Sequence, residues 1–335
     1  MSMRKIEWGS FSPEDVNFLQ QEDSMIKING AYLDRSNIVA ERMLKSIPPI
    51  TDPYVIIKTI DVESSDGKTH IAVFNPNSVD ETKAVIKEPQ ILDENSYHLM
   101  NVEAGIGLFA INNLRSLVPN FMQVLGLIRD GPKDVKIVLE YVEGLMLSEF
   151  VLSCSIEEFK SILLQLFNAL HVASHLYKFT HGGLHYNNVI VRRINHKIEI
   201  PIYDENLSVM GTLLTDLVPV IIDYGKSSIT INGFTLADDI ENVGDDHIFD
   251  YSCLLTRRPL PKHPGIYVSY LRQAILDPLT FMVERYTGKI CNDYTLGEFL
   301  EQIRKEGVFN EQEIQRGIER YRSINAFLFV KEIFV

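Results

Sequence analysis

Short runs of hydrophobic residues, separated by polar turns, occupy the first part of the chain. The runs at 54–57, 70–74 and 83–87 are rich in Val and Ile, and short runs of β-branched residues predict β-strands. Between the first two runs, residues 64–67 read Ser-Ser-Asp-Gly, which is typical of a turn. The pattern therefore predicts a hairpin and a third strand in a small antiparallel sheet.

Helical spacing of hydrophobic residues appears before and after these strands. Residues 37–47 have this spacing and are followed by a pair of prolines, which end a helix. Residues 95–117 have hydrophobic side chains three and four positions apart, as one face of a helix requires. Two further strands are predicted at 121–127 and 136–141.

The strongest helical pattern lies in the middle of the chain. Residues 155–177 carry a wide hydrophobic stripe. Ser155 and Glu158 fit a capping box, in which each side chain bonds to the backbone of the other residue. Residues 178–224 then change to a pattern of short strands and loops.

Hydrophobic helical runs dominate the last part of the chain, including 266–279 and 296–303. The order of strands, one helix, strands and then mostly helices predicts an α+β protein of two lobes, with the β-rich lobe first. The predicted parts are an N-terminal extension, a small β-rich lobe and a larger, mainly helical lobe, at 1–48, 49–140 and 141–335.

Composition excludes several classes of function. The net charge of −13 argues against nucleic-acid binding and against adsorption to an anionic membrane, because both depend on clustered Lys and Arg. Residues 1–15 contain no apolar run, so we expect no secretory signal there, and no uninterrupted apolar stretch predicts a membrane-spanning helix. Three cysteines without a C-x-x-C pair predict neither a disulfide framework nor a zinc site. We therefore expect an intracellular, cytoplasmic protein, or one in the host cell or virion if the source is viral.

The order of one set of polar and charged residues along the chain indicates a chemical function. Residues 180–191 read Thr-His-Gly-Gly-Leu-His-Tyr-Asn-Asn-Val-Ile-Val and follow the strong helix. Asp223 begins an Asp-Tyr-Gly motif 35 positions after Asn188 (223 − 188 = 35). Upstream, Lys87 ends a predicted strand, and Glu103 lies on the helix that follows. Each residue alone is common on protein surfaces, so the interpretation depends on their order and context.

This order resembles the protein kinase superfamily, whose signatures are a strand lysine, a helix glutamate, an H-R-D-L-x-x-x-N loop and D-F-G. The resemblance covers residues 50–300. The stretch from Glu103 to Phe121 is also similar to kinase-like proteins of large DNA viruses. The His-Gly-x-Leu-His form of the loop also resembles small-molecule phosphotransferases of the aminoglycoside and choline type.

The resemblance implies a bilobal protein-kinase-like fold that binds ATP and Mg²⁺. Lys87 would hold the α- and β-phosphates and pair with Glu103. Asn188 and Asp223 would hold the Mg²⁺ ions. Such a site needs a cation and metal-binding oxygens because phosphoryl transfer requires the triphosphate charge to be neutralised.

The resemblance also implies roles for residues outside the phosphate site. The backbone around Glu140 and Val142 would be the hinge that bonds the adenine. His181 would pack against the Asp-Tyr-Gly segment, and Asp250 would brace the catalytic loop.

Several positions depart from the kinase pattern. Gly183 stands where the catalytic aspartate is expected, so no side chain there can act as a general base. Gly182 replaces the loop arginine, which argues against control by a phosphorylated activation loop. The phosphate loop keeps one glycine, Gly67, and residues 202–217 are an apparent insertion.

Two other interpretations of this region are weaker. Ser227, Ser228 and Thr230 could be phosphorylated, but without the loop arginine we interpret them as part of a polar loop. His181 and His185 are spaced for a helical zinc site, but the glycines between them argue against a helix.

Three functions remain open. The first is a pseudokinase that binds a nucleotide and serves as a binding or scaffold module for a protein partner. The second is an active serine/threonine-type phosphotransferase that transfers phosphate to a protein without the usual base. The third is a structural or assembly protein that has the fold without the chemistry, since fold alone does not fix function.

Overall fold

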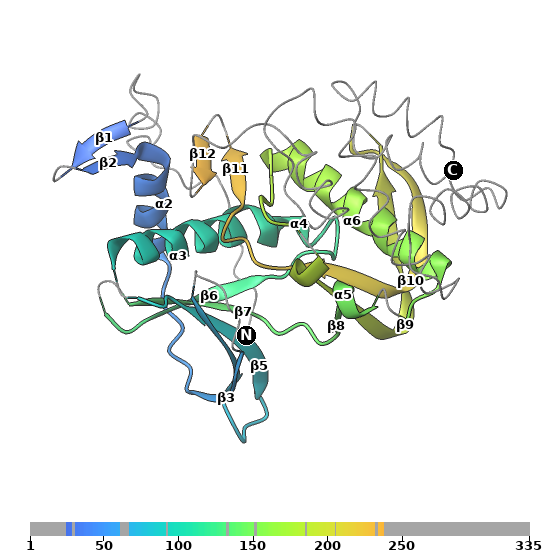
Figure 1. The fold of residues 1–335 in the computed structure, drawn as a ribbon, viewed down its shortest axis with the longest axis horizontal. Helices are drawn as coiled ribbons and strands as arrows, with labels where there is room; N and C mark the ends of the chain where they lie inside the picture. The colour runs from blue at the N-terminus through green and yellow to red at the C-terminus, as the bar shows by residue number, and fades with distance from the viewer. Residues whose placement is uncertain are drawn as a thin grey trace, which may run out of the picture.

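A computed structural model describes the part of the chain that carries the predicted phosphate site (Figure 1). The described residues are 25–28, 31–60, 67–91, 93–131, 134–150, 153–184, 186–204, 206–231 and 234–237. Most of the turn predicted at 64–67, the helices predicted at 266–279 and 296–303, and Asp250 lie outside them. Within them the protein is a mixed α+β structure rich in strands.

The predicted small sheet is present and has five antiparallel strands in the order β3-β4-β5-β7-β6. Their bounds are β3 Tyr54–Ile60, β4 Lys68–Phe74, β5 Thr82–Glu88, β6 Val124–Arg129 and β7 Val135–Glu140. The strand predicted from Phe121 begins three residues late. The reason is that Phe121 is buried and forms a bridge to Ile221, while the amide of Met122 donates to the Ile221 carbonyl at 2.9 Å.

The helix predicted at 95–117 is present but contains a π-helical turn. It consists of α3 Glu94–Ile106, the π-helix Gly107–Ile111 and the short α4 Asn112–Leu114. A side chain at Gly107 would meet Val124 at 2.0 Å, so glycine lets the helix approach β6 closely. The Asn112 side chain then bonds both the amide and the carbonyl of Val124, at 3.0 and 2.7 Å.

One element of the predicted N-terminal extension packs on this helix. The described residues of the extension include β1 Met25–Ile28, β2 Ala31–Asp34 and α2 Arg35–Ser46, of which α2 contacts α3. Arg129 of β6 donates to the carbonyls of Leu44 and Ile47 at the end of α2. The helix α2 is therefore attached to β6 by hydrogen bonds and to α3 by packing.

The second half contains one long helix against a long hairpin. The helix α6, Ile156–Tyr177, begins at Ser155, and the capping box with Glu158 is confirmed. The remaining elements are β8 Leu145–Met146, α5 Leu147–Phe150, the 3₁₀-helix Tyr186–Asn188, β9 Val189–Tyr203, β10 Val209–Ile221, β11 Ser228–Ile231 and β12 Phe234–Ala237.

The prediction of short strands and loops at 178–224 was wrong for most of that range. The strands β9 and β10 have 15 and 13 residues and pair from Val189–Ile221 to Tyr203–Val209. The residues at 202–217, interpreted as an insertion, are the outer part of this hairpin. It is continuous because the inner half of β10 is buried and contacts α6, so packing extends the strand beyond its local signal (Figure 1).

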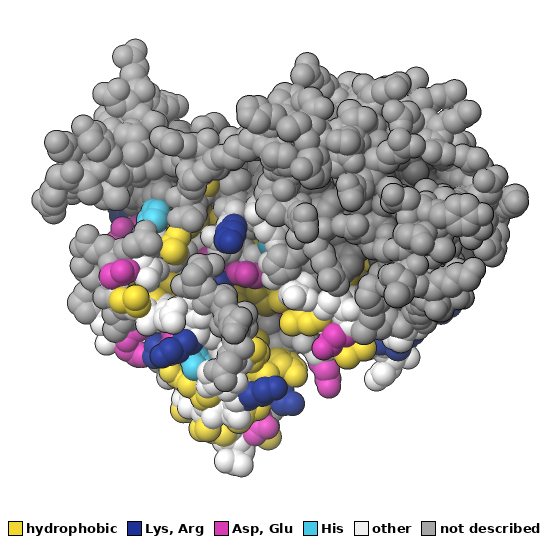
Figure 2. Space-filling model, viewed as in Figure 1, with side chains coloured by type: hydrophobic (Ala, Val, Ile, Leu, Met, Phe, Trp, Pro, Cys, Tyr) yellow, Lys and Arg dark blue, Asp and Glu magenta, His cyan; other side chains and the backbone are white. Residues whose placement is uncertain are grey.

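A continuous hydrophobic core joins α3, the π-helix, β6, β7, α6, β9 and β10. On the face shown in Figure 2, basic, acidic and hydrophobic side chains are interspersed over the described part of the surface. Charge alone therefore does not single out a region of that face. In the described part of the chain, no helix combines the length and hydrophobicity needed to cross a bilayer.

Candidate active site

Three charged residues from distant parts of the chain meet beside the core. Lys87 near the end of β5 donates to Glu103 Oε2 on α3 at 2.7 Å and to Asp223 Oδ1 after β10 at 2.8 Å. The Glu103 and Lys87 side chains are 1% and 11% exposed, whereas that of Asp223 is 47% exposed. The structure thus brings together three of the predicted site residues, with Glu103 at the buried end and Asp223 at the open end.

The charge states follow from burial and from mutual attraction. Burial alone lowers the pKa of Lys87, but attraction to Glu103 and Asp223 outweighs it and holds the pKa above its ordinary value. Burial raises the pKa of Glu103, and Lys87 offsets only part of that rise. For Asp223, burial raises the pKa, but Lys87 outweighs it and holds the pKa below its ordinary value. Lys87 is therefore protonated and Asp223 ionised at neutral pH.

The hairpin places Asn188 and Asp223 at the same end. Val189 and Ile221 pair across β9 and β10, and the amide of Ile222 donates to the Asn188 carbonyl at 3.0 Å. Asp223 has φ 67°, in the left-handed region that Asp tolerates better than most residues. The Asn188 side-chain NH₂ donates to the Gly183 carbonyl at 2.9 Å, and its amide oxygen is an acceptor of the kind that binds Mg²⁺.

The loop before Asn188 is fixed by a fully buried histidine. His181 Nε2 lies 2.9 Å from the Ile222 carbonyl, and the amide of Gly183 donates to Nδ1 at 3.3 Å. Because a carbonyl only accepts and an amide only donates, Nε2 carries the proton. The His181 ring also packs edge-on against Tyr224, with centroids 6.2 Å apart. His181 therefore ties the loop to the Asp-Tyr-Gly segment on two sides.

The two glycines of the loop differ in the space available for a side chain. Gly182 has φ 74°, and a Cβ there would lie 2.1 Å from the carbonyl oxygen of Lys226. At Gly183 the nearest neighbour of a Cβ would be Lys226 Cδ at 3.7 Å, an ordinary contact. The backbone therefore needs glycine at Gly182, whereas Gly183 has room for a side chain.

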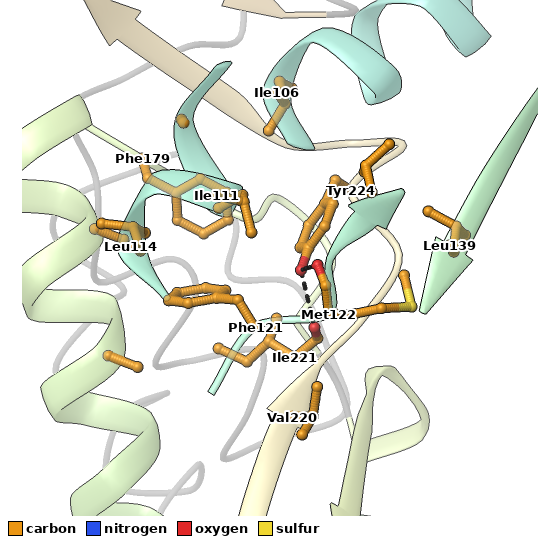
Figure 3. Close-up of a cluster of buried hydrophobic side chains, with 14 of the residues drawn as sticks. Ile106, Ile111, Leu114, Phe121, Met122, Leu139, Phe179, Val220, Ile221 and Tyr224 are labelled. Atoms are coloured by element: carbon orange, nitrogen blue, oxygen red, sulfur yellow. Dashed lines mark hydrogen bonds between the residues drawn. The ribbon is translucent and has the colours of Figure 1, made fainter. Parts of the chain in front are cut away.

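Tyr224 anchors the Asp-Tyr-Gly segment in the core (Figure 3). Its side chain is fully buried and packs edge-on against Phe179, with centroids 6.4 Å apart. Its hydroxyl donates to the Met122 carbonyl at 2.7 Å and lies 3.1 Å from the Ile221 carbonyl. The sequence marked Tyr224 only as the aromatic of the motif and gave no signal for this hydrogen bond.

The predicted hinge is held by ion pairs. Arg115 donates to both oxygens of Glu140, at 2.8 and 3.3 Å, and Arg192 lies 3.5 Å from Oε1. The Glu140 amide donates to the Gln123 carbonyl at 2.9 Å, so it is not available to adenine. An adenine ring would have to form hydrogen bonds with other backbone groups of the hinge. Val142, the other predicted hinge residue, is buried beyond the end of β7.

The interpretation of Ser227, Ser228 and Thr230 as a polar loop was wrong. Ser227 and Ser228 are buried, and Ser227 Oγ donates to the His181 carbonyl at 3.0 Å. Ser228 and Thr230 belong to β11, and Ser228 exchanges backbone hydrogen bonds with Thr180 at 2.8 and 3.0 Å. The segment after Asp-Tyr-Gly therefore returns to the loop and pairs with it.

Part of the chain is similar in sequence to two viral proteins. The chain is 31% identical over 137 residues to "Probable kinase 098L" of Invertebrate iridescent virus 3, across 40% of this chain and 25% of that protein. It is 30% identical to "Uncharacterized protein 179R" of Invertebrate iridescent virus 6, across 39% of this chain and 12% of that protein. The chain thus spans a quarter or less of these relatives. No protein-family model matches it. The similarity supports a kinase-like relationship over part of the chain.

Proposed function

We propose that this chain is a kinase-like protein that binds a nucleoside triphosphate with Mg²⁺ and, because it lacks the catalytic base, serves as a binding or scaffold module for a protein partner. The observation that carries the proposal is the ion pair of Lys87 with Glu103 and Asp223, next to a loop in which Gly183 has no side chain.

The charges and donor atoms of these residues fit the ligand. Lys87, Glu103 and Asp223 together have a formal net charge of −1, and the half-exposed carboxylate of Asp223 favours an incoming cation. Asn188 adds a side-chain amide oxygen, and its backbone is hydrogen-bonded to Ile222, the residue before Asp223. Bound Mg²⁺ would neutralise the phosphate charge, and Lys87 would exchange its bond to Asp223 for one to a phosphate oxygen.

Nucleotide binding is tested by thermal unfolding with ATP, with and without Mg²⁺. A ligand at 100 times its dissociation constant stabilises the folded state by about 2.7 kcal/mol. We expect stabilisation in the wild type, and its loss in Lys87→Met and in Asp223→Ala. Lys197→Met is the matched control, because Lys197 is exposed on β9. Absence of stabilisation of the wild type by ATP would refute nucleotide binding and leave a structural role.

A second candidate is an active phosphotransferase. Phosphoryl transfer depends more on positioning and charge neutralisation than on the base, and Lys87, Glu103 and Asp223 are in contact. Transfer of labelled phosphate from ATP to a protein or to the chain itself would favour this candidate if Asp223→Ala abolished it. A gain of transfer in Gly183→Asp, for which the loop has room, would favour the pseudokinase. General bases contribute about 10²–10⁴-fold, so that gain is measurable.

A further inference from the structure

Lys226, two residues after Tyr224, lies against both glycines of the loop. Its carbonyl oxygen occupies the space that a Cβ at Gly182 would need, 2.1 Å away. Its side-chain Cδ lies 3.7 Å from the position of a Cβ at Gly183. The space where a kinase base would begin is therefore bordered by the stem of a basic side chain.

The backbone of Lys226 is held on both sides. The amide of Ser227 donates to the Tyr224 carbonyl at 3.0 Å, and Ser227 Oγ donates to the His181 carbonyl at 3.0 Å. Tyr224 is itself anchored in the core. These bonds fix the backbone from which the Lys226 side chain extends, next to Gly182 and Gly183.

Lys226 and Lys87 differ in their ion-pair partners. Lys226 is exposed, and within the described ranges no carboxylate forms an ion pair with it. Lys87, in contrast, is held between two carboxylates. Adding Lys226 to the group of Lys87, Glu103 and Asp223 changes the formal net charge from −1 to 0, and the added cation extends from the segment that borders Gly183.

We propose that Lys226 binds the terminal phosphate of the nucleotide, so that the site prefers a nucleoside triphosphate to the diphosphate. This inference rests on the proposed function. Lys87, Asn188 and Asp223 would take the inner phosphates and the metal, and the base position beside Gly183 lies beyond the terminal phosphate in phosphoryl transfer. A protonated lysine at this position can bind a phosphate oxygen. It cannot replace the catalytic base, because a protonated amine has no lone pair to accept a proton.

Charge and packing are separated by matched substitutions at Lys226. Lys226→Met keeps a flexible hydrophobic stem against the glycines and removes the charge, whereas Lys226→Arg keeps the charge. The binding of Mg·ATP and Mg·ADP is measured by calorimetry for the wild type, both variants and the Lys197→Met control. We expect Lys226→Met to lower the affinity for ATP by about tenfold, as for one charge-assisted hydrogen bond. Affinity for ADP should change less than about twofold, and Lys226→Arg should stay near the wild type in both.

The outcomes separate the inference from the proposed function. If the wild type binds both nucleotides but Lys226→Met weakens neither, or weakens both equally, the role of Lys226 is overturned and nucleotide binding stands. If Lys226→Arg loses as much ATP affinity as Lys226→Met, the side chain acts by packing and the inference also fails. If the wild type binds neither nucleotide, the proposed function itself fails. A lower slope of ATP affinity against salt in Lys226→Met would support the charged contact.

Discussion

Removal of Lys87 tests whether the buried ion pair has the energetics that the structure implies. The Glu103 side chain is 1% exposed, and Lys87 lies 2.7 Å from Oε2. Within the described residues the other oxygen, Oε1, has no hydrogen-bond partner. Lys87→Met therefore leaves a buried carboxylate without its cation, and breaking such a pair costs about 3–5 kcal/mol. Loss of the ion pair between Lys87 and Asp223 adds only about 0–1 kcal/mol, because the Asp223 side chain is 47% exposed and water can replace the lysine.

The cost of Lys87→Met should depend on pH in a defined direction. Burial already raises the pKa of Glu103 above its ordinary value of 4.5, and the substitution removes the lysine that lowers it. A carboxyl whose pKa is higher in the folded than in the unfolded protein stabilises the fold below the unfolded value, and this contribution is lost as pH rises through the folded value. Lys87→Met should therefore be less destabilising near pH 5 than near pH 8.

Urea denaturation of the wild type, Lys87→Met and Lys87→Met/Glu103→Leu at both pH values measures these free energies of unfolding. The double variant removes both charges, so it should recover most of the stability lost at pH 8. A loss below about 1 kcal/mol at pH 8 in Lys87→Met would contradict the burial argument. An equal loss at the two pH values would contradict the assignment of the titrating group to Glu103.

Three further substitutions test the loop, the Tyr224 anchor and the α6 cap by urea denaturation. Gly182→Ala should destabilise by at least about 2 kcal/mol, because φ is 74° and the Cβ would collide with the Lys226 carbonyl. Gly183→Ala, its matched control, should change stability by less than about 0.5 kcal/mol; equal effects would refute the contrast. Tyr224→Phe should cost about 1–2 kcal/mol through the lost bond to the Met122 carbonyl, and no cost would refute that bond. Ser155→Ala should cost about 1 kcal/mol if the capping box holds α6.

Elements with strong local signals were predictable. The helix α6 starts where Ser155 and Glu158 place it, because both partners of a capping box lie within one turn. The strands β4 and β5 were found from their hydrophobic runs. The hairpin of β9 and β10 was missed because its length is set by pairing between the strands and by packing on α6. The π-helical turn was missed because it depends on the approach of β6 to Gly107.

The candidate site was likewise predictable only in part. The residue types and their order pointed to Lys87, Glu103 and Asp223, and the structure brings these three into contact. The left-handed backbone of Asp223 and the contact of Lys226 with the Gly182-Gly183 loop were not predicted. No periodicity or spacing in the sequence encodes a backbone dihedral angle or a contact between distant residues, so these features could be found only in three dimensions.

The energetics of Lys87 and Glu103 provide a test of whether this ion pair serves ligand binding or the stability of the core. A buried ion pair is expensive to desolvate, and replacing both partners by hydrophobic residues is often neutral or stabilising. Stability alone therefore gives no reason to place a lysine beside a fully buried glutamate and a half-exposed aspartate. A site that receives a polyphosphate does give such a reason, because the fold then holds a protonated amine between a buried and a half-exposed carboxylate. A double hydrophobic variant that keeps wild-type stability but fails to bind ATP would assign the pair to binding.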